Sequence, residues 1–69
     1  MAVKTIRYAC IGCGGIANNY HLPALARIDS AEFVVACDLD EERARETADR
    51  FEAQEAATDW ELVVERDDI

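Results

Sequence analysis

Apolar residues are concentrated in two dense runs along the chain. The first run, TIRYACI at residues 5–11, is rich in β-branched and aromatic types and stops at a glycine. The second run, EFVVACD at residues 32–38, is almost continuously apolar, which is typical of a strand covered on both faces in a parallel sheet. The pattern therefore predicts two buried strands over these ranges.

The segment after the first run has helical composition but contains a proline. Because Pro23 lacks an N–H and disfavours the helical conformation for the residue before it, an uninterrupted helix is excluded. We expect a first helix that continues to about His21. A kink or a restart of the helix should then follow, with Pro23 in the first turn.

The segment after the second run predicts a helix, a short strand and a last helix. Residues 41–51 follow a possible N-cap, Asp40, and place three apolar residues on one stripe, Ala44, Ala48 and Phe51. A short strand is expected near residues 56–58. In the helix expected over residues 60–66, Trp60 should anchor the helix against the sheet.

Strands and helices thus alternate in the order β-α-β-α-β-α, which favours right-handed parallel crossovers. We predict an α/β fold with a doubly wound parallel sheet. Sixty-nine residues amount to about half of an ordinary domain.

All three glycines of the chain fall in the turn after the first predicted strand. The turn fits the dinucleotide-binding pattern G-x-G-x-x-G/A and gives six candidate cofactor-binding residues, Gly12, Cys13, Gly14, Gly15, Ile16 and Ala17. Gly12 permits a sharp exit from the strand, and Gly14 lacks the Cβ that would keep a pyrophosphate from the backbone. Backbone N–H groups at the start of the helix would then face the phosphates.

Asp38, at the end of the second predicted strand, is the seventh candidate. It lies 21 residues after Ala17, where a dinucleotide fold needs a carboxylate to accept both hydroxyls of the adenosine ribose. A 2′-phosphate there would be repelled by Asp38 and Asp40, and no arginine follows Asp38 immediately. We therefore predict NAD as the cofactor in preference to NADP. With the glycine turn, this predicts a truncated Rossmann-like doubly wound parallel sheet that binds NAD(P). Residues 1–69 are interpreted as the amino-terminal part of a dinucleotide-binding Rossmann domain, with the rest of that domain and a substrate domain absent. The alternative is that the glycines form only a tight turn and Asp38 is a solvated strand end.

Charge and cysteine content limit the possible partners and compartment. The net charge is −8, and thirteen of the fifteen acidic residues lie in residues 38–69, which disfavours nucleic acid or an anionic membrane as a partner. No apolar run is long enough to span a bilayer, and the first residues do not resemble a signal peptide. With an odd number of cysteines, three, disulfides are not expected. We expect a cytoplasmic protein.

Cys10 and Cys13 form a C-x-x-C motif, which could indicate redox chemistry or a metal site. Cys10 falls inside the predicted strand and Cys13 in the glycine turn, so the two thiols need not face each other. There is also no second C-x-x-C. We therefore predict no metal site and no redox role for this pair.

The runs YACIGCGGIANNYHLPAL and FVVACDLDEERARETADRF resemble the amino-terminus of the glucose-fructose oxidoreductase and inositol dehydrogenase family, Gfo/Idh/MocA. The resemblance covers essentially the whole chain. It implies a Rossmann nucleotide domain, a second domain for substrate, and hydride transfer between a nicotinamide cofactor and a sugar, cyclitol or related polyol. We expect the longer parent protein to be a homo-oligomer.

Family members also carry a Glu-Lys-Pro motif, whose lysine serves in catalysis, beyond the length of this chain. No catalytic residue is therefore assigned here. The leading interpretation is that the chain is the amino-terminal part of an NAD(P)-dependent oxidoreductase and binds its nicotinamide dinucleotide. The alternatives are a free-standing module that senses NAD or another nucleotide without catalysis, and a non-functional remnant.

Overall fold

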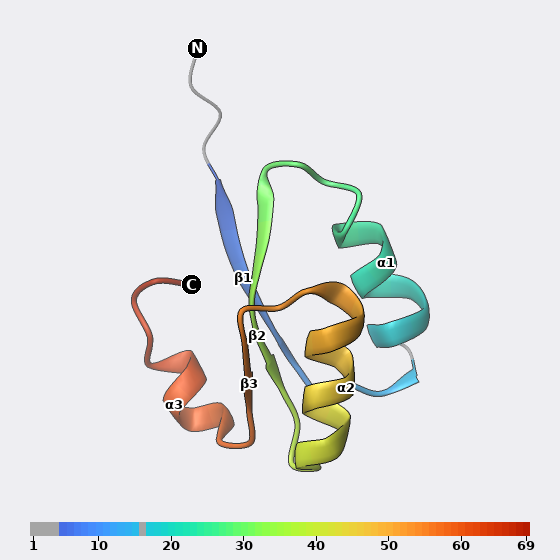
Figure 1. The fold of residues 1–69 in the computed structure, drawn as a ribbon. Coiled ribbons are helices and arrows are strands. Elements are labelled where there is room, and N and C mark those ends of the chain that lie inside the picture. Colours follow the sequence, from blue (N-terminus) through green and yellow to red (C-terminus); the bar gives the residue numbers. More distant parts are fainter. Residues whose placement is uncertain (1–4, 16) are drawn as a thin grey trace.

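Three parallel strands form one sheet in the computed structural model, which describes residues 5–15 and 17–69. The sheet order is β1-β2-β3, and the strands span, respectively, Ile6–Ile11, Ala31–Cys37 and Glu55–Ala57. Each boundary lies within one residue of its prediction. The α/β class and the parallel, Rossmann-like sheet are confirmed (Figure 1).

The two later helices begin at aspartate caps. Helix α2 spans Glu41–Phe51, and the carboxylate of Asp40 accepts hydrogen bonds from two N–H groups of its first turn, at 3.1 and 3.3 Å. Helix α3 spans Trp60–Val64 and is capped by Asp59, whose carboxylate accepts one hydrogen bond, from the Glu61 N–H at 3.1 Å. These side chains satisfy amide groups that have no partner within the helix, so local sequence is sufficient to set both starts.

The segment between the glycine turn and β2 contains two short helical pieces. A π-helical turn, η1, spans Ala17–His21, and α1 spans Leu22–Leu25 with Pro23 in its first turn. The predicted restart at the proline is confirmed. The first piece, however, has π-helical rather than α-helical geometry, which is rare and is frequently found at functional sites.

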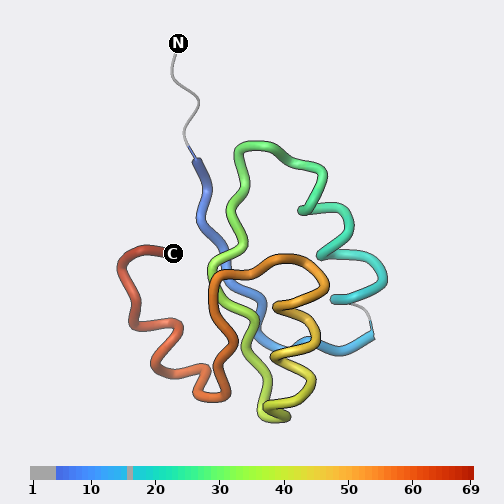
Figure 2. The backbone as a smooth tube through the Cα atoms, in the orientation of Figure 1, coloured from blue at the N-terminus to red at the C-terminus, as the bar shows by residue number. Residues whose placement is uncertain are grey.

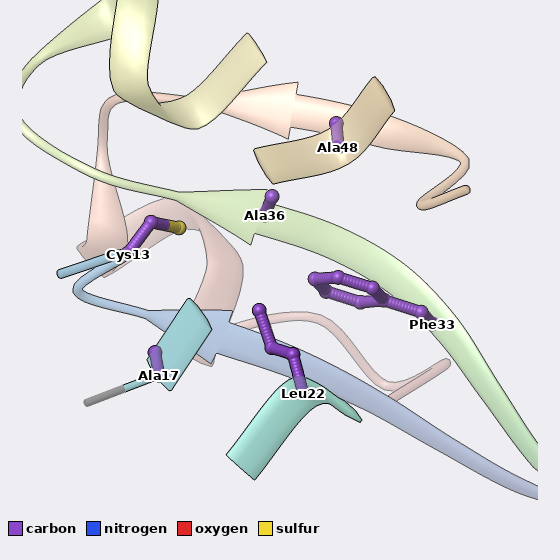
Figure 3. Packing of buried hydrophobic residues seen from close by; sticks show 6 residues of the cluster. All are labelled: Cys13, Ala17, Leu22, Phe33, Ala36 and Ala48. Atoms are coloured by element: carbon purple, nitrogen blue, oxygen red, sulfur yellow. The ribbon is translucent and has the colours of Figure 1, made fainter. Parts of the chain in front are cut away.

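The sheet is covered on both faces (Figures 1 and 2). The cluster beneath α1 and α2 contains six buried residues, Cys13, Ala17, Leu22, Phe33, Ala36 and Ala48 (Figure 3). The cluster on the α3 face contains four, Val34, Val35, Cys37 and Val63. Residues 33–37 of β2 are all buried, so the prediction of a strand covered on both faces is confirmed.

The structure departs from the sequence analysis at a β-bulge in β2, which was not predicted, and at Trp60, whose predicted position was wrong. Tyr8 pairs with Phe33 but Ala9 pairs with Val35, so Val34 is an extra residue in β2. The interpretation of Trp60 as the anchor of α3 was wrong, because its exposed fraction is 49% and Val63 is the buried residue of this helix. As the first residue of α3, Trp60 lies outside the core and beside a cavity.

No helix in residues 5–15 and 17–69 has the length and apolar character needed to cross a membrane.

Candidate functional site

The candidate residues meet at the carboxyl ends of β1 and β2. The glycine turn follows β1, and Asp38 follows β2 directly. Because the two strands are parallel neighbours, their ends lie at the same edge of the sheet. The Gly12 N–H continues the pairing by donating to the Cys37 carbonyl at 2.8 Å. The fold thus brings together the two elements that the sequence pattern singled out.

The glycines meet different steric demands. Gly12 has a φ of +90°, in the left-handed region that side chains disfavour, so the exit from β1 requires a glycine. A Cβ added to Gly14 would meet no atom within 4 Å. The space beside Gly14 is therefore open, as a backbone that receives a ligand requires.

The Asp38 carboxylate is bound to the backbone through both of its oxygens. Its Oδ2 accepts a hydrogen bond from the Cys13 N–H at 2.8 Å, and its Oδ1 accepts one from the Asp40 N–H at 2.9 Å. The bonds from Asp40 and Cys13 lower the pKa of Asp38 below its ordinary value. The half-buried carboxylate is thus ionised at neutral pH and held against the glycine turn.

Cys13 and Ala17 lie in the core beneath the turn (Figure 3). The exposed fraction of Ala17 is 8%, and its small side chain permits the close packing that the third position of the pattern requires. Cys13 occupies a variable position of the pattern but is only 1% exposed, and its Sγ lies 3.4 Å from the Cys37 carbonyl oxygen. Ile16 lies outside the described residues.

Two cavities adjoin this edge of the sheet. One, of about 360 Å³, lies between the turn and α2, where its lining includes Gly14, Gly15 and Arg43. The other, of about 290 Å³, is lined by seven residues, Ile11, Gly12, Cys37, Asp38, Leu39, Thr58 and Trp60. The second cavity combines apolar side chains with a single carboxylate, which suits a flat apolar ring attached to a hydroxylated sugar.

Five further residues line the first cavity but escaped the sequence analysis, Asn18, Arg43, Glu46, Thr47 and Arg50. The Asn18 Nδ2 donates to the carbonyls of Cys13 and Gly14 at 3.0 and 3.3 Å and lies 3.2 Å from the Thr47 Oγ1. Arg43 lies close enough to Asp38 to contribute to the lowered pKa of that carboxyl. Thr47 could have been noticed as the polar member of an otherwise apolar helix stripe, whereas Asn18 and Arg43 carried no comparable signal.

The three thiols are buried to different degrees around the turn and are protonated at neutral pH. Burial raises the pKa of all three, that of Cys10 to about 11. Cys10 packs against the cluster that contains Cys13, so the two cysteines lie on the same face of the sheet. Within the described residues, no three His, Cys, Asp or Glu side chains are placed to hold a metal ion.

Comparison with known proteins places this site in a family. A model of the oxidoreductase family with an NAD-binding Rossmann fold, GFO_IDH_MocA, matches residues 6–69. D-apiose dehydrogenase from Paraburkholderia graminis is 47% identical over 49 residues, which are 71% of this chain and 13% of that enzyme.

Two solved structures of KijD10, a 3-ketoreductase from Actinomadura kijaniata, superpose with a TM-score of 0.87 at 32% identity; one is of a single-site mutant. Each contains NADP and TDP-benzene, and the match covers 96% of this chain and 20% of KijD10. The chain therefore spans only a small part of the relatives it matches. With its glycine turn, its parallel sheet and a family match over residues 6–69, the chain belongs to the Gfo/Idh/MocA family of NAD-binding Rossmann oxidoreductases.

Proposed function

We propose that the chain binds a nicotinamide dinucleotide, NAD in preference to NADP, as the amino-terminal part of an oxidoreductase that acts on a sugar, cyclitol or related polyol. The observation that carries the proposal is the pairing of an open glycine turn with an ionised carboxylate. Asp38 lies within hydrogen-bond distance of the turn, and the space beside Gly14 is empty of protein atoms. A dinucleotide needs both features side by side.

The pyrophosphate would lie against the backbone of the turn. Gly14 and Gly15 line the cavity between the turn and α2, and neither has a side chain to shield its N–H group. Arg43 and Arg50 line the same cavity, and neither forms an ion pair within the described residues. Glu46 also lines the cavity, so its charged side chains carry one net positive charge, which favours an anionic ligand there despite the net charge of −8 of the whole chain.

The adenosine would occupy the cavity beside Asp38. Each oxygen of that carboxylate accepts one backbone N–H, and a carboxylate has about four acceptor positions in all. Acceptor positions therefore remain for the two ribose hydroxyls. Leu39 and Trp60, which are 87% and 49% exposed, would pack against the adenine and lose solvent contact.

Binding of NADP is the second candidate, and Arg43 favours it. This arginine lies in the first turn of α2 and acts electrostatically on Asp38, so it could receive a 2′-phosphate that Asp38 repels. KijD10, a neighbour in fold, was solved with NADP. We expect NAD to remain preferred. NADP carries a phosphate on the 2′-oxygen, so the hydrogen bond from the 2′-hydroxyl to Asp38 would be lost.

The role that we propose for the described residues is cofactor binding, and none of them is assigned to the hydride-transfer step. The bound cofactor would provide the hydride acceptor, while these residues bind and orient its adenosine and pyrophosphate. In the described sheet β1 has a neighbour on one side only, and Ile6 and Ile11 are 60% and 48% exposed along it. A further strand from a longer polypeptide would cover this edge. We expect the 69-residue chain alone to show no sugar-dependent reduction of NAD.

The test compares Asp38→Ala with Asp49→Ala, a change that removes an exposed carboxylate of α2 instead. Titrations with NAD and NADP can be followed by calorimetry and by the fluorescence of Trp60, the sole tryptophan, which lines the Asp38 cavity. Asp38→Ala should weaken NAD binding by about 10- to 100-fold and narrow the preference over NADP. An unchanged preference in Asp38→Ala would refute the assignment of Asp38, and failure of the unmodified chain to bind either dinucleotide would refute the proposed function.

A further inference from the structure

Side chains from outside the glycine turn hold three successive peptide groups of that turn. The Cys13 N–H, in the first peptide group, donates to the Asp38 Oδ2 at 2.8 Å. The carbonyls of Cys13 and Gly14, in the next two, accept hydrogen bonds from the Asn18 Nδ2 at 3.0 and 3.3 Å. The Asn18 N–H also donates to the Gly14 carbonyl, at 3.0 Å.

The geometry of the peptide bond converts these contacts into a direction for the turn's N–H groups. In a planar trans peptide, the C=O of one residue and the N–H of the next point in opposite directions. The described chain contains no cis peptide bond. When Asn18 holds the Cys13 and Gly14 carbonyls on its own side, the N–H groups of Gly14 and Gly15 must therefore point away from Asn18.

Asn18 is itself held by α2. Its Nδ2 lies 3.2 Å from the Oγ1 of Thr47, a side chain that is 2% exposed and therefore has little freedom to move. Since both backbone partners of the Asn18 amide are carbonyls, only its nitrogen can satisfy them. Through Asn18 and Thr47, the orientation of the turn is thus fixed relative to α2. The same β2–α2 segment of the chain carries Asp38, which holds the turn at the Cys13 N–H.

We propose that Asn18 is a positioning residue, supported by Thr47, that orients the Gly14 and Gly15 N–H groups toward the pyrophosphate of the dinucleotide. This inference rests on the proposed function, because it assumes that the turn receives phosphate. It assigns Asn18 no contact with the ligand. The consequence is selective: loss of Asn18 should weaken ligands that carry a pyrophosphate and spare those that do not.

The first test uses Asn18→Leu, which keeps the branched shape of the side chain and removes its donors. Asn19→Leu is the matched control, because Asn19 is exposed and its side chain makes no hydrogen bond within the described residues. ADP and adenosine are the probes, titrated by calorimetry with thermal unfolding recorded in parallel. Asn18→Leu should weaken ADP binding by about tenfold, because the Gly14 and Gly15 N–H groups must then be ordered when the pyrophosphate binds, and should change adenosine binding by less than about twofold.

Two substitutions of Thr47 test whether its hydroxyl supports Asn18: one removes the hydroxyl and the other keeps it. Thr47→Val removes the hydroxyl and should reproduce part of the loss of ADP affinity, whereas Thr47→Ser keeps the hydroxyl and should restore it. Asn18→Leu should have less effect in the Thr47→Val background than alone, because the two residues act in one chain of contacts. Equal weakening of ADP and adenosine, or no weakening of either, would overturn the inference.

A measurement without ligand separates this inference from the proposed function. In the free chain, Asn18→Leu should raise the backbone mobility of Gly14 and Gly15, seen as lower heteronuclear NOE values, and leave Gly12 unchanged. Equally rigid Gly14 and Gly15 amides would overturn the role of Asn18 whatever the chain binds. If these amides loosen as expected but the unmodified chain binds neither ADP nor NAD, only the proposed function fails.

Discussion

Charged side chains have different partners at the two ends of the sheet. At the carboxyl ends of β1 and β2, the Asp38 carboxylate is satisfied by backbone N–H groups, while Arg43 lines an open cavity nearby. At the amino ends, Arg7 and Arg66 each contact two carboxylates. Their N···O distances are 2.9 Å to Glu32 and 3.5 Å to Asp68 for Arg7, and 2.9 Å to Glu55 and 2.6 Å to Asp68 for Arg66.

The difference separates a structural cluster from a binding site. The amino-end charges neutralise one another through side chains that are 29–51% exposed, so each pair contributes little stability and has little charge left for a ligand. At the carboxyl end the backbone binds the aspartate, so Arg43 and Arg50 of α2, which form no ion pair within the described residues, can act on a ligand, whereas Arg45 is paired with Glu41. A site for an anion thus depends on which charges the protein leaves without partners.

The largest effect is expected from a side chain placed in the open space of the carboxyl end. Gly14→Val should abolish dinucleotide binding, a loss of roughly 100-fold or more, because the valine would occupy the space of the pyrophosphate. The fold should persist, since a Cβ at this position meets no protein atom within 4 Å. Calorimetric titration with NAD, alongside a thermal unfolding curve, measures both quantities. Near-normal NAD affinity would remove the turn from the site.

A smaller effect is expected at the start of the same turn, on the free energy of unfolding rather than on ligand binding. Gly12→Ala should lower the free energy of unfolding by about 1–2 kcal/mol, because an L-residue is disfavoured at a φ of +90°. Gly15→Ala is the control, since Gly15 has no positive φ and its Cβ would meet only the Asn19 side chain, at 3.9 Å. Urea unfolding measures the difference. Equal stability of the two variants would contradict the strain assigned to Gly12.

The smallest effect concerns the cause of the lowered pKa of two carboxyls, Asp38 and Asp68, which lie at opposite ends of the sheet. Backbone N–H groups lower the pKa of Asp38, whereas hydrogen bonds from Arg66 lower the pKa of Asp68 to about 2. Since both are more acidic in the folded chain, each stabilises the fold above the ordinary pKa of 3.8 and loses that contribution as the pH falls through its folded value. For Asp68 the window is from 3.8 to about 2.

Salt distinguishes the two carboxyls. In about 1 M sodium chloride, screening of the exposed ion pair should move the pKa of Asp68 back toward 3.8, whereas that of Asp38 should stay low because its hydrogen bonds come from the backbone. NMR titration of the side-chain carboxyl carbons at low and high salt measures both values. Arg66→Gln should reproduce the change at Asp68 alone. Equal responses of the two carboxyls to salt would contradict the comparison.

Local sequence patterns were sufficient to predict the elements and the position of the glycine turn. The apolar runs of β1 and β2, the caps Asp40 and Asp59, and the break at Pro23 each depend on residues within a few positions of one another. The placement of Asp38 at the same edge of the sheet as the turn also followed, because parallel strands place their carboxyl ends together, but its hydrogen bond to the turn did not. Such features depend on backbone rules that short segments obey wherever they occur.

Tertiary structure alone decided which side chains hold the turn. Asn18 meets Thr47 across 29 positions of sequence, and the backbone of Cys13 meets Asp38 across 25. The bulge at Val34 and the exposure of Trp60 likewise depend on how helices pack on the two faces of the sheet. These contacts require the relative placement of whole elements, because packing selects among side-chain positions that the local pattern leaves equally possible.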